Sequence, residues 1–245
     1  MKLISVTWSY GNESHIEETI LYRSFIKHNN EKDFINIHYN RTNYEELEKE
    51  FHSKFGYQYE FLLYRIFLLS DRLKSIDDDV FIFSDTTDVV CVGNINDIEY
   101  TGGIIFSAER HQYPNDISSW KPINTYPQEN LDKSNFLNAG LQMSEKNLYS
   151  DFLESVIEHV FPIEYKTFGG DQGVFIYYYI NEFFPKITLD TSRNIFVSTY
   201  LTSAEWYKIN DGKVQYIPTN SFPFFIHDNG WNYGSPRIIE RYNLI

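Results

Sequence analysis

The stretch Phe81-Ile82-Phe83-Ser84-Asp85-Thr86-Thr87-Asp88-Val89-Val90 places two carboxylates directly after a short apolar run. The run 80–83 predicts a buried central strand of an α/β sheet. In open α/β sheets, ligands bind beyond the carboxyl ends of the strands, and Asp85 and Asp88 lie at that end. A tight turn at this spacing can direct both carboxylates toward one hard cation such as Mg²⁺ or Mn²⁺. The alternative is an ordinary Asp-rich turn that caps a helix.

Outward from this strand, helical and extended patterns alternate along the chain. Strands are expected at 2–7, 34–39, 80–83, 103–108, 136–143, 186–189, 195–197, 214–217 and 224–226, and helices at 17–28, 57–73, 144–160 and 171–184. This order predicts a single α/β domain over residues 1–245, with a central, mostly parallel mixed sheet flanked by helices. The acidic run Asp77-Asp78-Asp79 precedes the central strand, so it should form a solvated loop at the opposite end of the sheet.

Composition excludes several classes of partner. Acidic residues outnumber basic ones 34 to 21, and the formal net charge is −13, which disfavours nucleic acid and anionic membranes. No apolar run is long enough to span a bilayer, and no signal peptide is recognisable. With a single cysteine, Cys91, these features predict a cytoplasmic protein. The abundance of Asn, Ile and Tyr is typical of an AT-rich microbial or large-virus genome.

A second strand end repeats the pattern of an apolar run followed by polar residues. The stretch Phe224-Phe225-Ile226-His227-Asp228-Asn229-Gly230 ends an expected strand at His227. The imidazole of His227 can join the two carboxylates on one ion, since Mn²⁺ accepts mixed oxygen and nitrogen ligands. The alternative is a hydrogen-bonded histidine without a metal, with Asn229-Gly230 as a simple turn.

Three further segments contain candidate ligand-binding residues. Asp171, in Gly169-Gly170-Asp171-Gln172, either caps a helix or places a carboxylate beside a bound sugar. Asn138-Ala139-Gly140 either brings backbone close to a ligand or ends a strand. Tyr113 lies in the long irregular stretch 109–134, where its ring could cover a bound sugar or base.

Taken in order, these segments resemble the glycosyltransferase domain of the procollagen lysyl hydroxylase and collagen glucosyltransferase family. The resemblance rests on six blocks, each weak alone: residues 83–90, Phe106-Ser107-Ala108-Glu109 with Tyr113-Pro114, residues 136–140, Asp171-Gln172, residues 187–190 with Ile195-Phe196, and residues 227–230. They extend from about the first third of the chain to near its end.

The resemblance implies a GT-A-type nucleotide-sugar-binding fold and a metal-dependent enzyme that uses a UDP-sugar. It implies that Mn²⁺ (or Mg²⁺) is bound by Asp85, Asp88 and His227, and that Asp171 is the catalytic residue near the donor sugar. It places the uridine near Thr7. The whole set of expected donor-binding residues is Thr7, Tyr113, Asn138, Gly140, Asp171, Gln172 and Gly230.

The chain also departs from the family pattern at three places. Gly169 and Gly170 stand where the family carries acids before its glutamine, and Tyr113 stands where the family carries a tryptophan. After Gly230 the family tends to carry a lysine, whereas here the nearest base is Arg237. These departures bear on the donor sugar and on the catalytic role of Asp171.

The expected function is therefore transfer of a sugar from a UDP-sugar to a hydroxyl acceptor on a glycan, a protein or a small molecule. A non-catalytic protein that binds a nucleotide sugar or a glycan is the alternative on the same fold, and the two glycines favour it. A sugar nucleotidyltransferase would need a Gly-rich, basic phosphate loop after the first strand, which residues 7–12 do not provide. The residues after Asp85 do not match an aspartyl-nucleophile phosphohydrolase.

Overall fold

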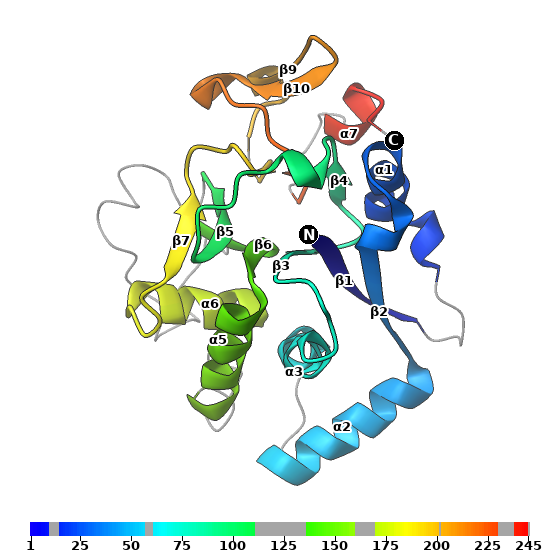
Figure 1. Ribbon diagram of the computed structural model, residues 1–245, viewed down its shortest axis with the longest axis vertical. Coiled ribbons are helices and arrows are strands. Elements are labelled where there is room, and N and C mark those ends of the chain that lie inside the picture. Colours follow the sequence, from blue (N-terminus) through cyan, green and yellow to red (C-terminus); the bar gives the residue numbers. More distant parts are fainter. Residues whose placement is uncertain are drawn as a thin grey trace.

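The computed structural model is organised around a six-stranded sheet with the strand order β2-β1-β3-β6-β5-β7 (Figure 1). It describes residues 1–9, 15–56, 61–110, 136–159, 170–200, 202–229 and 238–244. The strands of this sheet are β1 (Lys2–Ser9), β2 (Phe34–Asn40), β3 (Val80–Ser84), β5 (Ile104–Glu109), β6 (Phe136–Glu145) and β7 (Ile187–Asp190). All neighbours pair in parallel except β6, which runs antiparallel to β3 and β5. The predicted α/β class, with a mostly parallel mixed sheet, is confirmed.

Helices α3 (Phe61–Leu73), α5 (Lys146–His159) and α6 (Asp171–Ile180) cover one face of the sheet (Figure 1). Because side chains alternate along a strand, Phe81 and Phe83 of β3 pack in the core cluster on this face, whereas Ile82 belongs to the cluster on the other. Helix α2 (Arg41–Phe55) joins the first cluster through Leu47 and Phe51. The apolar faces of the helices and sheet thus bury one another, which fixes α3 beneath the carboxyl end of β3.

The opposite face is covered by α1 (Ile20–His28) and by a small sheet with the order β4-β11-β8. Its strands are β4 (Val89–Cys91), β11 (Phe225–His227) and β8 (Phe196–Ser198). The hairpin of β9 (Tyr207–Asn210) and β10 (Lys213–Tyr216) and helix α7 (Ile238–Arg241) pack around a third apolar cluster on the far side of this sheet. Short 3₁₀ helices complete the described elements: η1 (Ile16–Glu18), η2 (Glu31–Asp33), η3 (Ile95–Asp97), η5 (Ala204–Trp206) and η6 (Ile217–Thr219).

Most expected elements are present, and four differ clearly: α2, β4, β9 and α6. Helix α2 lies where the sequence patterns predict nothing, because its surface is largely polar. It is capped by the Asn40 side chain, which accepts from the Asn43 N–H at 3.0 Å, and ends at Gly56 with φ +79°. Strands β4 and β9 have three and four residues, too few to show a period. Helix α6 ends at Ile180 rather than at residue 184.

Two local expectations are corrected. The turn that holds Asp85 and Asp88 leads into strand β4 and not into a helix. The residue before α6 is Gly170, with φ +94°, so Asp171 is the first residue of the helix and not its N-cap. A helix that is both long and apolar enough to cross a membrane does not occur in the described parts of the chain.

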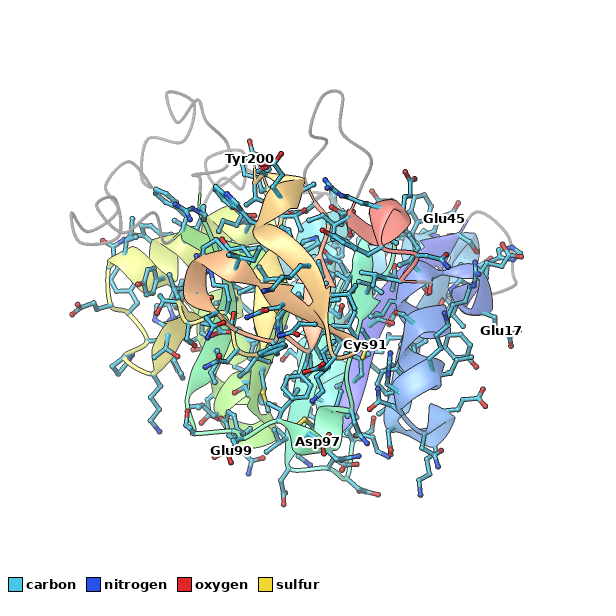
Figure 2. All side chains as sticks on the ribbon, turned by 90° about the horizontal axis from the view of Figure 1, so that it is seen from above. Glu17, Glu45, Cys91, Asp97, Glu99 and Tyr200 are labelled. Atoms are coloured by element: carbon cyan, nitrogen blue, oxygen red, sulfur yellow. The ribbon has the colours of Figure 1, made fainter. Side chains whose placement is uncertain are left out.

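The acidic run before β3 lies at the amino end of the strand, as predicted. The Asp78 carboxylate accepts from the N-terminal ammonium at 3.3 Å and lies 3.7 Å from Lys2 Nζ. Figure 2 shows the two ends of the molecule: Tyr200, just beyond the carboxyl end of β8, lies opposite Asp97 and Glu99. The acidic residues 77–79 and 97–99 are therefore separate from the polar residues at the carboxyl ends of the strands.

Candidate functional site

Asp85, Asp88 and His227 converge on one point at the carboxyl end of β3. One ligand atom from each residue lies within 4.8 Å of the ligand atoms of the other two. His227 Nε2 lies 3.4 Å from Asp88 Oδ1 and 3.8 Å from Asp85 Oδ2. The His227 side chain is 4% exposed, whereas Asp85 and Asp88 are 27% and 28% exposed, so a ligand can reach the carboxylates.

The backbone explains why residues so far apart in sequence meet here. Strand β11 pairs antiparallel with β4, and this register sets His227 opposite Val89, next to Asp88. The Asp228 N–H donates to the Asp88 carbonyl at 2.7 Å, and the Asp85 N–H donates to the Gly140 carbonyl at 2.9 Å. The turn between β3 and β4 is thus held from both sides, by β11 and by β6.

Gly140 provides the space in which the two ligands meet. The pairing of β6 with β5 shifts between Phe106, opposite Gln142, and Ser107, opposite Asn138, so residues 139–141 bulge out of this ladder. A Cβ at Gly140 would lie 2.7 Å from Asp85 Oδ2 and 2.7 Å from His227 Nδ1. Glycine is therefore required here for close approach of the two side chains, and it does not end a strand, because β6 continues to Glu145.

Replacing Gly140 with alanine is expected to lower the affinity of the protein for Mn²⁺ by about 100-fold, because the new methyl group pushes the ligands apart. Calorimetric titration with Mn²⁺ measures this. Gly93→Ala is the matched control, since its Cβ would meet Phe224 Cδ1 at 2.7 Å, away from the cluster. It should cost stability without changing Mn²⁺ affinity. Equal Mn²⁺ affinity in Gly140→Ala and wild type would contradict the assigned role.

Arg65 of helix α3 joins Asp85 to Asp171. Its Nη1 donates to Asp85 Oδ1, its Nη2 donates to Asp171 Oδ2, and its Nε also donates to Asp171 Oδ2, at 3.1 Å. The guanidinium also lies over the Phe83 ring, 5.2 Å from the centroid. Burial lowers the pKa of Arg65, but the charges of Asp171 and Asp85 raise it by more, so the net shift of the pKa is upward. Arg65 is therefore a fixed cation beside the cluster.

The sequence contained a signal for Arg65 that the motif reasoning missed. It is the one charged residue between Phe61 and Ser70, in a segment otherwise apolar or neutral. A charge on the buried side of such a helix needs acidic partners, and Asp85 and Asp171 supply them. Asp171, expected beside the donor sugar, has its Oδ2 bound to Arg65 and its Oδ1 accepting from the Gln172 N–H at 2.8 Å.

Asn138 and Glu109 lie behind His227. Asn138 Oδ1 is 2.9 Å from His227 Nδ1, and Asn138 Nδ2 donates to Glu109 Oε1 at 2.6 Å. Burial raises the pKa of Glu109 to about 7, although hydrogen bonds from Asn229 and Asn138 oppose the shift. Burial also lowers the pKa of His227, but the Asp88 and Asp85 carboxylates raise it by more, so the net shift of the pKa is upward. The two carboxylates of the cluster therefore favour a positive charge beside them.

A cavity of about 440 Å³ opens in front of the cluster. Its wall includes Asp85, Asp88 and Arg65 on one side and the end of β1 with Thr7 on the other. The Thr7 hydroxyl donates to Asn36 Oδ1 at 3.0 Å and lies 3.1 Å from His38 Nδ1. Thr7 lines the same cavity as the two carboxylates, and its expected contact with the uridine stays a prediction.

The remaining expected residues fall in different places. Gln172 Oε1 accepts from the Ala139 N–H at 3.3 Å, and its Nε2 is buried without a partner among the described residues. Gln172 thus supports the β6 bulge beside the cluster. Tyr113 and Gly230 lie outside the residues that the structure describes.

The chemistry of the cluster fits a divalent cation. Two carboxylates and one imidazole match the ligands that Mn²⁺ accepts, and Mg²⁺ shares the preference for carboxylate oxygen. The space at Gly140, which a Cβ would fill, lets the three side chains approach one another. The residues Asp85, Asp88 and His227 can therefore hold such an ion and leave other positions open for a ligand in the cavity.

Comparisons with known proteins identify the family. Among curated proteins, none matches this sequence. A solved structure, described as a glycosyltransferase involved in the glycosylation of the major capsid of PBCV-1, aligns over 100% of this chain and 98% of its own. Its sequence identity is 12% and the TM-score is 0.46. The family model of the PLOD GT domain matches residues 45–241, which is more than half of the chain. The chain therefore belongs to the PLOD GT domain family.

Proposed function

We propose that the chain transfers a sugar from a UDP-sugar to a hydroxyl group of a glycan, a protein or a small molecule, with Mn²⁺ or Mg²⁺ held by Asp85, Asp88 and His227. Membership of a glycosyltransferase family supports the reaction class. The observation that carries the proposal is the position of the Asp–Asp–His cluster at a cavity of about 440 Å³ that extends along the end of β1. A nucleotide can lie along such a cavity with its phosphates at the cluster.

The end of β1 provides a site for the base. Strand β1 pairs with β3 only as far as Ile4, whereas its pairing with β2 continues to Ser9. The stretch from Val6 to Ser9 lines the cavity, so a ligand in the cavity can lie along this strand. Uracil presents one N–H between two carbonyl groups, and a strand edge offers complementary donors and acceptors. We place the uridine here.

The side chains at the other end of the cavity suit the diphosphate. A divalent cation bound there would neutralise the charge that accumulates on the diphosphate as the bond to the sugar breaks. Arg65 adds a positive charge that is fixed in place by Asp85 and Asp171 and lines the same cavity. Holding donor and acceptor together in the cavity would supply much of the remaining rate enhancement.

Asp171 has a role in this proposal even though both oxygens of its carboxylate already accept hydrogen bonds. Its oxygens bind Arg65 and the Gln172 N–H, so in this arrangement it acts by holding Arg65 toward the donor. Direct stabilisation of positive charge at the anomeric carbon stays a prediction, which requires that the Asp171 carboxylate face the sugar. Asn138, Gly140 and Gln172 support the wall behind His227.

The pairing of Asp171 with Arg65 favours a second function, binding of a nucleotide sugar without transfer. If Asp171 stays paired with Arg65, no free carboxylate from this helix reaches the anomeric carbon. Such a protein would bind UDP through the same cluster and cavity. The two functions differ in whether a donor is consumed.

The test is a panel of UDP-sugars incubated with Mn²⁺ and candidate acceptors, with released UDP as the readout. We expect release from at least one UDP-sugar, loss of release with a chelator, and recovery when Mn²⁺ is restored. GDP- and ADP-sugars serve as controls for the base.

Three outcomes would decide between the alternatives. Tight UDP binding without release from any donor would favour the binding function. Release that continues undiminished in chelator would contradict the metal assignment. Equal release from ADP-sugars would contradict the uridine site at β1.

A further inference from the structure

Glu109 is an acid buried behind the cluster, with only amides and a hydroxyl as hydrogen-bond donors in the described structure. It ends β5 and is 1% exposed. Its Oε1 accepts from Asn138 Nδ2 at 2.6 Å, from Asn229 Nδ2 at 2.8 Å and from Ser198 Oγ at 3.5 Å. A buried carboxyl is costly to desolvate, so a chain that keeps one here needs a reason other than core packing.

The contacts of Asn138 determine how its amide is oriented. Its NH₂ faces the acceptor Glu109 Oε1, and its Oδ1 accepts from the Gly140 N–H at 3.0 Å. Because a backbone N–H can only donate, both ends of the amide are assigned independently of His227. Reversing the amide would set its NH₂ against the Gly140 N–H and its oxygen against Glu109.

This orientation fixes the imidazole. His227 Nδ1 lies 2.9 Å from Asn138 Oδ1, an acceptor, so Nδ1 must carry a hydrogen. The neutral ring then has its lone pair on Nε2, the atom 3.4 Å from Asp88 Oδ1 and 3.8 Å from Asp85 Oδ2. An imidazole binds a metal only through a nitrogen with a free lone pair.

We propose that Glu109 is a positioning residue that holds His227 in its Nδ1–H tautomer through Asn138, so that Nε2 is directed at the metal. This rests on the proposed metal role of His227. Glu109 is not one of the three proposed metal ligands. It acts by orienting an amide, and the amide orients the ligand.

The test combines a tautomer readout with metal affinity. In ¹⁵N-histidine-labelled, metal-free protein, at a pH where the imidazole is neutral, two-bond ¹H–¹⁵N spectra identify the protonated nitrogen of His227. We expect the Nδ1–H form in wild type. In Glu109→Leu, which removes the acceptor, we expect a mixture of tautomers and Mn²⁺ affinity lower by about 10- to 100-fold. In Glu109→Gln, whose amide oxygen can still accept, we expect the His227 tautomer and the Mn²⁺ affinity to be close to those of wild type.

Several results would overturn the inference. An Nε2–H tautomer in wild type would do so without any variant, even if Glu109→Leu failed to fold. A folded Glu109→Leu with an unchanged tautomer and unchanged Mn²⁺ affinity would also overturn it. Because the tautomer is read without metal, a wild-type protein that binds no Mn²⁺ but shows the expected tautomers would refute the metal site, while the effect of Glu109 on the His227 tautomer would still stand.

Discussion

Replacing Asp88 with alanine is expected to lower the rate of the proposed UDP-sugar turnover by about 10³-fold, because one of the three proposed metal ligands is lost where the leaving diphosphate would be neutralised. The fold should survive. Asp88 is partly exposed, and the bond that ties its turn to β11 uses its backbone carbonyl, which accepts from the Asp228 N–H. Released UDP at saturating Mn²⁺ measures the effect, and circular dichroism checks the fold.

Asp77→Ala is the matched control. Asp77 is an exposed acid of the same chain segment, but it lies at the amino end of β3. Its loss changes net charge by the same amount and should leave turnover unchanged. If Asp88→Ala retained full activity on a verified UDP-sugar, Asp88 would not be a ligand of the catalytic metal.

Replacing Arg65 with methionine is expected to lower the free energy of unfolding by about 3–5 kcal/mol, because breaking a buried ion pair leaves an uncompensated charge. Asp171, whose side chain is 6% exposed, and Asp85 would both lose the Arg65 guanidinium that pairs with them. Urea unfolding at neutral pH, followed by tyrosine or tryptophan fluorescence, measures the change.

The control for this prediction lies on the same helix. Arg72 of α3 is exposed, so Arg72→Met should change the unfolding free energy by less than about 1 kcal/mol. The double variant Arg65→Met with Asp171→Leu should recover part of the loss, because the more deeply buried carboxylate is removed as well. Equal unfolding free energies for Arg65→Met and wild type would show that the buried pair contributes nothing.

The sequence predicts the part of the fold that apolar periodicity determines. The strands of the main sheet and helices α1, α3, α5 and α6 follow from runs and spacings of apolar residues, whereas α2 does not, because its surface is polar. For α2 a signal was present in Asn40 before the helix and Gly56 after it, which are typical cap residues. The short strands β4 and β9 leave too few residues for any pattern.

Local sequence patterns likewise predict some of the site residues and miss others. Asp85 and Asp88 follow the buried strand β3, and His227 is the last residue of β11, so their position at a strand end was predictable. Their meeting depends on the pairing of β11 with β4, which joins residues far apart in the chain and leaves no local signal. Glu109 is likewise the last residue of a strand, β5, but its hydrogen bonds come from amides 29 and 120 residues away.

Pulsed EPR of Mn²⁺ bound to the ¹⁵N-histidine-labelled protein tests the metal assignment most directly. We predict a hyperfine coupling from one directly coordinated imidazole nitrogen, which disappears in His227→Ala, together with a ³¹P coupling when UDP is added. Bound Mn²⁺ that shows no histidine nitrogen coupling, or a coupling that persists in His227→Ala, would contradict the account.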